Sequence, residues 1–304
     1  MNYQQIFNSI GNELKTFEDT GEVAAYIPEL KKVDPNQFGA FLTTIEGEKS
    51  SFGDFNTKFS IQSIAKVFAL TMAYTRLGEY LWERVDVEPS GKAYNSIVQL
   101  ETDLGLPRNP LINAGALVVS DILVSSLKNP KTDFIDFVRE IANNNSINYS
   151  ERIANSEKLT GFRNAALINL MKSFGNIEND IDEVLDFYFN LCSIEMTCEE
   201  LSTSFLYLAN HGKSYIHPNR IISKIRAKRI NSIMQLCGFY DEAGEFAFKV
   251  GLPGKSGVGG GIAAICPCKY SIAVWSPKLN IKGNSTKGIE FLERFTTATE
   301  YSIF

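Results

Sequence analysis

Histidine is scarce in this chain of 304 residues, where only two histidines occur. His211 and His217 both lie in the polar stretch 210–218, whose composition is typical of a loop. A Ser-His-Asp triad or a histidine-rich metal site would have to draw on these two residues. If the protein is a hydrolase, we therefore expect its general base to be a residue other than histidine.

Cysteine is also sparse, and its spacing argues against a metal site. The five cysteines form no Cys-x-x-Cys pair, and the closest two, Cys266 and Cys268, have a spacing that suits a zinc knuckle poorly. Scattered cysteines in odd number are better explained as reduced thiols than as a disulfide framework. We therefore expect a cytoplasmic protein that binds no metal.

Long apolar runs and a strong charge of one sign are absent as well. No apolar stretch is long enough to span a bilayer, and residues 1–7 lack the basic start and apolar core of a signal peptide. The net charge of -5 argues against a nucleic-acid-binding surface. In the one basic cluster, residues 221–230, Lys and Arg alternate with Ile and Ala, as on a solvated helix face. We expect neither a membrane nor a nucleic acid as partner.

Hydrophobic periodicity predicts strands near both chain ends and helices between them. Residues 2–17 have the pattern of an amphipathic helix, and residues 38–45 and 49–52 have the pattern of a hairpin. From about residue 64 to residue 235, the apolar residues keep a helical period. The further predicted elements are strands at 246–250, 262–266 and 270–275 and a last helix at about 286–302.

Strands from the two chain ends can complete one antiparallel sheet. We therefore predict an α/β protein of the α+β type, in which this sheet is flanked by helices and joined by a helical lobe. A single domain, residues 1–304, would divide into a sheet subdomain at about 1–62 and 236–304 and a helical subdomain at about 63–235. The cleft between two such lobes is a usual place for a ligand.

Ser63 and Lys66 form a Ser-x-x-Lys motif at the start of the helical region. Residues three apart lie on one helix face, so the hydroxyl and the amine could approach each other. Ser60 could cap this helix, whose N-terminal N–H groups would favour charge on a reacting oxygen. The arrangement suits a serine nucleophile with a lysine base. A helix that merely contains both residues is the alternative, since Ser125 and Lys128 form the same motif at a predicted helix end.

A glycine-rich stretch, residues 251–261, is the second organising feature. A phosphate-binding loop would need a glycine at position 249, where Lys249 stands, and a helix after it, where a strand is predicted. Lys255-Ser256-Gly257 on a strand beside a Ser-x-x-Lys helix is instead the layout of penicillin-recognising serine enzymes. In that layout, a backbone N–H of the strand and the N–H of the nucleophile could form an oxyanion hole.

Five motifs extend the likeness over most of the chain. They read Ser-Ile-Gln-Ser-Ile-Ala-Lys-Val-Phe (60–68), Asn-Pro-Leu-Ile-Asn-Ala-Gly-Ala (109–116), Ser-Glu-Lys-Leu-Thr-Gly-Phe-Arg-Asn (156–164), Cys-Gly-Phe-Tyr-Asp (237–241) and Val-Gly-Leu-Pro-Gly-Lys-Ser-Gly-Val-Gly-Gly-Gly (250–261). In this order, from about residue 20 to residue 304, the sequence resembles the serine-dependent glutaminases. Departures are slight: Ala65 stands where a serine is common and Gly254 where an alanine is common. The resemblance implies a fold like that of β-lactamases and DD-peptidases.

The resemblance implies hydrolysis of L-glutamine to L-glutamate and ammonia without a metal or an organic cofactor. Ser63 matches the family's nucleophile, and Lys66 matches its base, which must be neutral; burial favours the neutral amine by lowering its pKa. Tyr26 and Tyr240 match family tyrosines near the nucleophile, and we favour Tyr240 as the proton donor to the departing ammonia. Val258 matches the position whose backbone N–H joins that of Ser63 at the oxyanion.

For substrate binding, the resemblance implies that Glu157 pairs with the substrate ammonium. Asn113, Asn164, Tyr188 and Tyr26 match the remaining positions and can donate to the substrate carboxylate or amide. Taken singly, these residues could also be a helix cap, a core residue or a surface carboxylate. We further expect a homodimer or homotetramer. Two other functions stay open, a β-lactamase or peptidase and a catalytically silent sensor of glutamine or glutamate.

Overall fold

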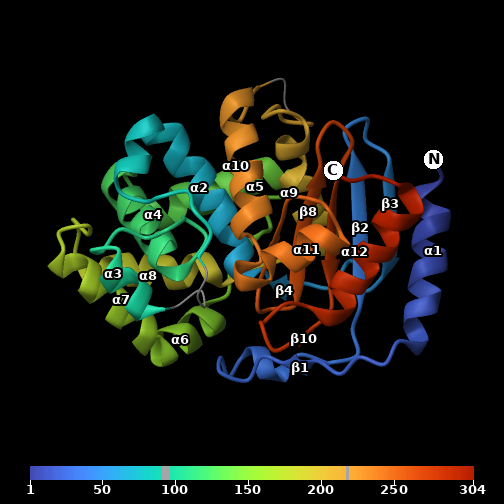
Figure 1. Cartoon of the computed structure of the whole chain (residues 1–304), viewed down its shortest axis with the longest axis horizontal. Helices are drawn as coiled ribbons and strands as arrows, with labels where there is room; N and C mark the ends of the chain where they lie inside the picture. Colours follow the sequence, from blue (N-terminus) through green and yellow to red (C-terminus); the bar gives the residue numbers. More distant parts are fainter. Residues whose placement is uncertain (91–95, 217–218) are drawn as a thin grey trace.

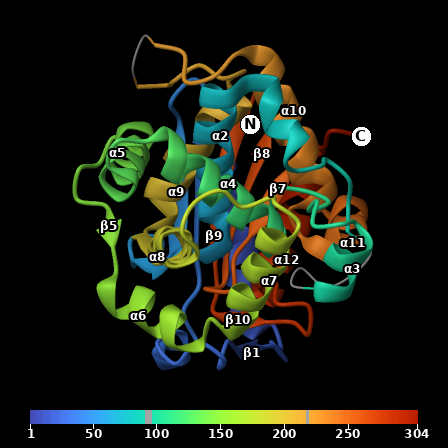
Figure 2. The same ribbon diagram turned by 90° about the vertical axis from the view of Figure 1, so that its left-hand side faces the viewer.

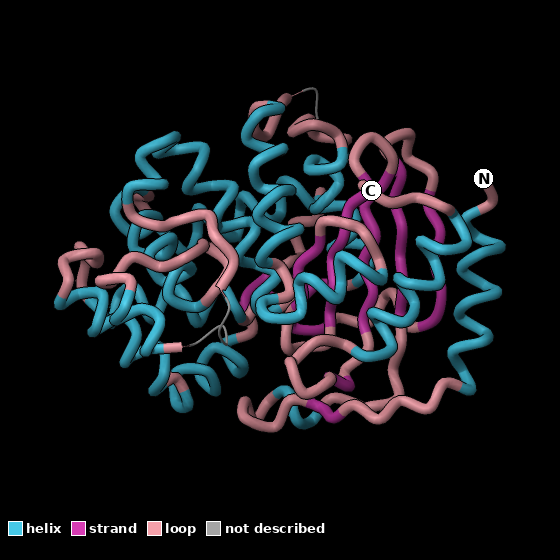
Figure 3. The backbone as a smooth tube through the Cα atoms, viewed as in Figure 1, coloured by secondary structure: helices cyan, strands magenta, loops and turns pink. Residues whose placement is uncertain are grey.

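The computed structural model describes residues 1–90, 96–216 and 219–304. A five-stranded antiparallel sheet lies at the right of Figure 1, and a helical part lies at the left. Figure 2 looks from the helical side with the sheet behind, and Figure 3 shows most strand residues gathered in one half of the molecule. The predicted sheet flanked by helices is confirmed, whereas the exact subdomain boundaries stay a prediction. In the described residues, no helix combines the length and apolar character needed to cross a membrane.

The two ends of the chain build the sheet together. Its order is β3-β2-β9-β8-β7, with β2 (Gly39–Thr44), β3 (Lys49–Gly53), β7 (Gly254–Ser256), β8 (Gly261–Cys266) and β9 (Tyr270–Trp275). The central pair, β2 and β9, runs from Gly39 opposite Trp275 to Thr44 opposite Tyr270. Strands predicted at 38–45, 49–52, 262–266 and 270–275 are thereby confirmed, with β2 and β3 forming one hairpin and β8 and β9 another.

Both faces of this sheet are buried, because successive side chains of a strand point to opposite faces. In β2, Leu42 belongs to an apolar cluster with Phe7 of α1 (Tyr3–Glu13) and Phe291 of α12 (Thr286–Thr299). Its neighbour Phe41 belongs to the other cluster, which includes Phe205 of α9 (Cys198–Ala209). Helices from both chain ends thus cover one face, while a helix from the middle of the chain covers the other. The two terminal helices were predicted.

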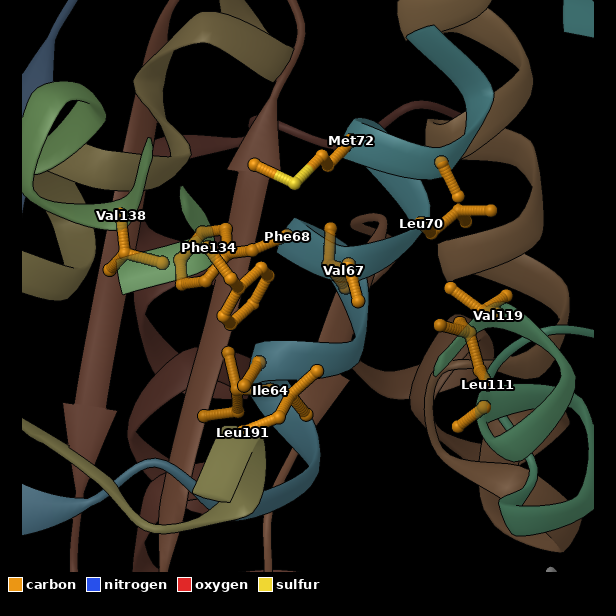
Figure 4. Packing of buried hydrophobic residues seen from close by; sticks show 14 of the residues in the cluster. Ile64, Val67, Phe68, Leu70, Met72, Leu111, Val119, Phe134, Val138 and Leu191 are labelled. Atoms are coloured by element: carbon orange, nitrogen blue, oxygen red, sulfur yellow. The ribbon is translucent and has the colours of Figure 1, made fainter. Parts of the chain in front are cut away.

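The central helix of the helical part is α2 (Ala65–Leu77), in which residues 65–74 are all buried. A helix that is apolar around its whole circumference is a core helix. Figure 4 shows Leu111 and Val119 on one side of it and Phe134 and Val138 on the other. The surrounding helices are α3 (Ile97–Thr102), α4 (Asn113–Ser126), α5 (Pro130–Ala142), α6 (Glu151–Thr160), α7 (Phe162–Ser173), α8 (Ile181–Cys192) and α10 (Lys224–Cys237).

Short strands that were not predicted tie the parts together. Two of them, β1 (Glu22–Val23) and β10 (Lys278–Leu279), pair with each other. Three more form a small sheet in the order β4-β6-β5, made of β4 (Phe59–Ser60), β6 (Ile194–Met196) and β5 (Asn148–Tyr149). This second sheet fixes the residues just before α2 against the segment that follows α8.

One predicted strand is wrong, because residues 246–250 belong largely to α11 (Ala243–Lys249). Phe246 stacks on Phe239 with 3.6 Å between ring centroids, whereas Phe248 is 90% exposed. Glu245 and Lys249 form an ion pair at 2.9 Å, one helical turn apart. Apolar residues at every second position imitated a strand here, although one of them faces solvent. Period-2 alternation over only five residues does not distinguish the two structures.

Residues 91–95 and 217–218 lie outside the described part of the chain, and with them His217, one of the two histidines. The other histidine, His211, follows the end of α9. The predicted basic helix face is present on α10, where Arg229 forms an ion pair with Glu79 at 2.6 Å.

Candidate active site

Ser63 lies in a single 3₁₀ turn, Gln62–Ile64, that continues directly into α2. Ser60 does not cap this helix, contrary to prediction, because β4 places it against the end of α8. Its hydroxyl donates to the carbonyl of Cys192 at 3.1 Å and accepts from Gln62 Nε2 at 3.0 Å. Ser63 therefore stands at the N-terminal end of a buried helix, as predicted, but the strand pairing and not a cap holds it there.

Two residues of the site have a left-handed backbone although neither is glycine. Gln62, with φ of 49°, directly precedes the nucleophile candidate, and Tyr240, with φ of 57°, faces the same cavity. Such conformations cost about 1–3 kcal/mol each and collect at functional sites, where the surrounding structure enforces them. The fold thus maintains backbone strain on both sides of Ser63.

Lys66 lies one turn further along α2 and is fully buried. Its Nζ donates to Asn113 Oδ1 at 2.7 Å and to the carbonyl of Leu111 at 3.2 Å. Burial lowers the pKa of Lys66 to about 8, against the opposing effect of Cys192 and Glu157. A neutral amine has two N–H groups and one lone pair. Because two acceptors hold the two N–H groups, the lone pair remains available to a hydroxyl.

Asn113 is the first residue of α4, and its contact with Lys66 fixes the orientation of two amides. The charged lysine has only donors, and the neutral lysine with its lone pair left for the hydroxyl also turns an N–H group to Asn113. In both forms, Asn113 therefore presents Oδ1 to Lys66. Its Nδ2 then donates to Asn164 Oδ1, on α7, at 2.9 Å. Asn164 is left with its own Nδ2 as a donor, and its side chain lines the cavity beside Ser63.

This cavity has a volume of about 270 Å³. Lys66 lies beneath it, with Nζ 5.9 Å from the ring centroid of Tyr188 and 5.7 Å from that of Tyr240. Tyr188 and Tyr240 are buried, whereas Tyr26 is 55% exposed. All the other residues predicted for the site line the cavity itself: Tyr26, Ser63, Asn113, Glu157, Asn164, Tyr188, Tyr240 and Val258. The sequence therefore identified a set of residues that the fold brings together.

Glu157, on α6, is a buried carboxylate that faces the cavity. Its Oε1 has no hydrogen-bond partner in the part of the chain that the structure describes. Burial raises the pKa of Glu157 to about 7, whereas Gln62 and Lys66 act in the opposite direction. A buried carboxylate oxygen without a partner is unfavourable until a cation or donor reaches it. The position is therefore suited to a ligand ammonium group.

The glycine-rich stretch packs directly on the turn that carries Ser63. A Cβ atom on Gly259 would lie 2.0 Å from the carbonyl oxygen of Ser60, and one on Gly257 would lie 2.4 Å from that of Ile61. Only glycine permits this approach. Within the described residues, neither the N–H of Ser63 nor that of Val258 donates to another backbone carbonyl. Both are therefore available to a developing oxyanion.

Some residues of the site were not selected from the sequence. Lys255 is fully buried, donates to the carbonyls of Gly238 and Ser256, and lies with Nζ 4.1 Å from the ring centroid of Tyr240. Burial, followed by the proximity of Lys66, lowers the pKa of Lys255 well below its usual value. Lys255 is the lysine of the Lys-Ser-Gly motif, so the sequence did contain a pattern that could have identified it. Lys255 does not line the cavity, whereas six residues that were not selected do: Ile27, Gln62, Thr160, Gly161, Arg163 and Cys192. Gln62 lies within the motif at 60–68 and Thr160, Gly161 and Arg163 lie within the motif at 156–164, but Ile27 and Cys192 belong to none of the five motifs.

Metal ligands do not gather at this site or elsewhere in residues 1–90, 96–216 and 219–304. No group of three or more His, Cys, Asp and Glu side chains there is placed to hold a metal ion. The groups at the cavity instead include hydroxyls, phenols, amides, a thiol, one guanidinium and one carboxylate, with the Lys66 amine beside them. They suit nucleophilic attack on a polar, zwitterionic substrate.

The model of the Glutaminase family matches residues 21–304 of this chain. The chain belongs to the glutaminase family. It is 59% identical over 304 residues to a glutaminase of Saccharophagus degradans, covering 100% of this chain and 99% of that protein. To a glutaminase of Christiangramia forsetii it is 54% identical over 304 residues, covering 100% of both.

Solved structures of glutaminases have the same fold. The probable glutaminase ybaS, 30% identical, superposes with a TM-score of 0.94 over 99% of this chain and 98% of that one. A probable glutaminase from Bacillus subtilis complexed with 6-diazo-5-oxo-L-norleucine, also 30% identical, gives 0.85 over 99% and 95%. The predicted β-lactamase-like fold is confirmed, and the glutaminase described here is an amidohydrolase.

Proposed function

We propose that this glutaminase hydrolyses L-glutamine to L-glutamate and ammonia, with Ser63 as nucleophile and Lys66 as general base. The observation that carries the proposal is the environment of the Lys66 amine. Its pKa is lowered to about 8, and its N–H groups are held by Leu111 and Asn113. A lysine prepared in this way can take the proton of a serine hydroxyl one turn away near neutral pH.

The cavity supports a free amino acid as substrate. Glu157 Oε1 is the group for the α-ammonium, and Asn164 Nδ2 and the Tyr188 hydroxyl are donors for the carboxylate or the side-chain amide. Asn113 completes this set, and Tyr26 closes the mouth. A volume of about 270 Å³ lies below the usual range for drug-sized ligands, which favours a single amino acid over a peptide.

In the first half of the proposed reaction, Ser63 Oγ attacks the side-chain carbonyl carbon of glutamine and its proton passes to Lys66 Nζ. The carbonyl π pair moves to oxygen, where the N–H groups of Ser63 and Val258 bind it. Collapse of this intermediate breaks the C–N bond. The departing nitrogen takes a proton from Tyr240, our preferred donor over Tyr26, and leaves as ammonia. Lys66 restores the tyrosine proton, leaving a glutamyl ester on Ser63.

In the second half, water attacks the ester carbon and gives its proton to neutral Lys66. The same two N–H groups bind the oxyanion. Breaking the ester C–O bond returns the proton from Lys66 to Ser63 Oγ and releases glutamate. No cofactor enters this scheme.

Ammonia release from glutamine, with asparagine as control substrate, tests the proposal. We expect Ser63→Ala and Lys66→Ala each to lower kcat by a factor on the order of 10³ or more. Hydroxylamine should divert the acyl-enzyme of the wild type to glutamyl hydroxamate, while Ser63→Ala should yield none. Near-normal glutamine turnover by Ser63→Ala would eliminate the nucleophile assignment. Nitrocefin hydrolysis without ammonia release would point to a β-lactamase instead.

We further propose that the enzyme is a cytoplasmic homodimer or homotetramer. Five unpaired cysteines support a reducing compartment. Light scattering after size exclusion and fractionation of cells test the two statements separately.

A further inference from the structure

Cys268 and His211, neither of which lines the catalytic cavity, bring a thiol and an imidazole together. Cys268 Sγ lies 3.0 Å from His211 Nε2. Cys268, with φ of 64°, is the third residue of the turn from Cys266 to Lys269, directly after Pro267. His211, with φ of 55°, follows the C-terminus of α9. Glycine or asparagine is usual at the third position of such a turn and just after a helix C-terminus, where the backbone is left-handed. The local backbone therefore does not explain why a cysteine and a histidine occupy these two positions.

Cys268 differs from the other four cysteines in its accessibility. Those four are buried, and burial raises the pKa of each of their thiols: Cys192, Cys198, Cys237 and Cys266. Cys268 is exposed. Thiolates are the reactive form of cysteine, and buried apolar thiols are inert. An imidazole within hydrogen-bond distance can take the thiol proton, so Cys268 is the cysteine equipped to act as a nucleophile.

An apolar groove of about 900 Å³ lies beside this pair. His211 lines it, and so does Pro267, the chain neighbour of Cys268, whereas Cys268 itself does not. The groove lies between α10, beside the sheet in Figure 1, and the C-terminal segment, where Ile303 lines it. Ile225 and Leu236 of α10 line it with 58% and 51% of their surfaces exposed. With Leu208, Pro253 and Ile303 they give the groove an apolar lining, and exposed apolar surface of this kind marks binding grooves.

The same groove contains polar groups that are unsatisfied. The amide nitrogen and oxygen of Gln235 are buried and have no hydrogen-bond partner in the described part of the chain, and Gln235 lines the groove. Lys224 and Lys228 line it as well. A buried amide without partners is costly, and a ligand carbonyl that accepted from Gln235 Nε2 would offset part of that cost.

We propose that Cys268 is a covalent modification site for small apolar α,β-unsaturated carbonyl compounds, which the groove beside His211 holds. His211 Nε2 takes the thiol proton, and the sulfur forms a bond to the β carbon. The C=C π pair shifts to give an enolate, and the imidazolium returns the proton to the α carbon. The product is a thioether adduct, and no oxidant or further reactant enters the step.

Maleimides test this site on the full-length enzyme, because N-ethylmaleimide and N-phenylmaleimide share one electrophile and differ in apolar size. Mass spectrometry of the intact protein gives the second-order rate constant of each reagent, and peptide mapping locates the adduct. The rate constants of both reagents with glutathione provide the reference. We expect one adduct, on Cys268, and a ratio of phenyl to ethyl rates several-fold above that of glutathione. His211→Asn should slow both reagents about tenfold. Leu236→Glu should return the ratio to that of glutathione.

Labelling spread over several cysteines, a phenyl-to-ethyl ratio equal to that of glutathione, or an unchanged rate in His211→Asn would each overturn the proposal. Asparagine is the replacement of choice at position 211 because it tolerates the left-handed backbone. Cys268→Ser serves as the unlabelled control. Circular dichroism and glutamine turnover check that each variant is folded, and the wild-type ratio decides the proposal if a variant does not fold.

Discussion

Asn113 Oδ1 accepts a 2.7 Å hydrogen bond from Lys66 Nζ, while Asn113 Nδ2 donates to Asn164 Oδ1 at 2.9 Å. One neutral side chain thus connects the proposed general base with a proposed substrate ligand. An amide oxygen satisfies the amine without offering it a full negative charge. The low pKa of Lys66 therefore depends on the residue at position 113 being uncharged.

Asn113→Asp should raise the pKa of Lys66, because a carboxylate favours the ammonium form. In the wild type, kcat/KM should rise with pH up to about 8, where Lys66 loses its proton. In the variant this limb should move up by about one unit or more, so activity at neutral pH falls and partly recovers in alkali. Asn113→Ala, which adds no charge, should lose activity without the shift. A limb at the wild-type position in Asn113→Asp would contradict this account of the base.

Glu157→Gln should weaken the binding of glutamine, because it removes the negative charge opposite the substrate ammonium. We expect KM to rise about tenfold or more with a smaller change in kcat. Glu157 must be ionised to bind the substrate ammonium, and burial raises its pKa to about 7. KM of the wild type should therefore increase as pH falls below about 7, because the carboxylate becomes protonated.

The matched control for this variant is Glu151→Gln. Glu151 is exposed at the start of the same helix, α6. Its replacement by glutamine should leave KM unchanged. An unchanged KM in Glu157→Gln would refute the ammonium role.

The lowered pKa of Lys66 should also make the stability of the folded protein depend on pH. The folded-state pKa of about 8 lies below the ordinary value of 10.5, so between these values the unfolded chain binds a proton that the folded protein does not. The free energy of unfolding should therefore rise with pH there, by up to about 1.4 kcal/mol per pH unit relative to Lys66→Met. Urea titrations at several pH values measure the difference. A difference that is constant from about pH 8 to about pH 10.5 would show that Lys66 is not buried as a neutral amine.

Gly259→Ala should separate the glycine-rich stretch from the Ser63 turn, because the new Cβ would meet the carbonyl oxygen of Ser60 at 2.0 Å. We expect kcat to fall about a hundredfold or more, since a displaced Val258 N–H no longer binds the oxyanion. Gly244→Ala is the control: Gly244 is exposed on α11 with no atom within 4 Å of an added Cβ. It should keep full activity and gain up to about 1 kcal/mol of stability. If Gly259→Ala and Gly244→Ala had the same kcat, the close approach of Gly259 to Ser60 would not be required for catalysis.

The parts of the molecule that the sequence predicted well are those with a local or motif-based signal. Strands β2, β3, β8 and β9 follow from period and turn residues. Ser63, Lys66 and most of the residues selected for the cavity belong to short motifs of fixed spacing, whereas Tyr26 and Tyr188 lie outside the five motifs. Each of these features can be found within a window of a few residues.

The failures depend on contacts between distant segments. The Ser60 hydroxyl is taken by the carbonyl of Cys192, which no local pattern reveals. Phe248 faces solvent and Phe246 stacks on Phe239, so alternation was mistaken for a strand. Gln62 lines the cavity and has a left-handed backbone, which its residue type does not predict. Such features require the assembled fold.

The pairing of β2 with β9 also sets an order of events during synthesis. Residues 39–44 cannot pair with residues 270–275 until residues 45–269 have also emerged from the ribosome. Long-range pairing of this kind is slow, and unpaired strand edges are exposed to aggregation meanwhile. The nascent polypeptide thus displays its serine and lysine long before the glycine-rich segment arrives. In the mechanism proposed above, amide cleavage can therefore begin only after residues 251–261 have been synthesised.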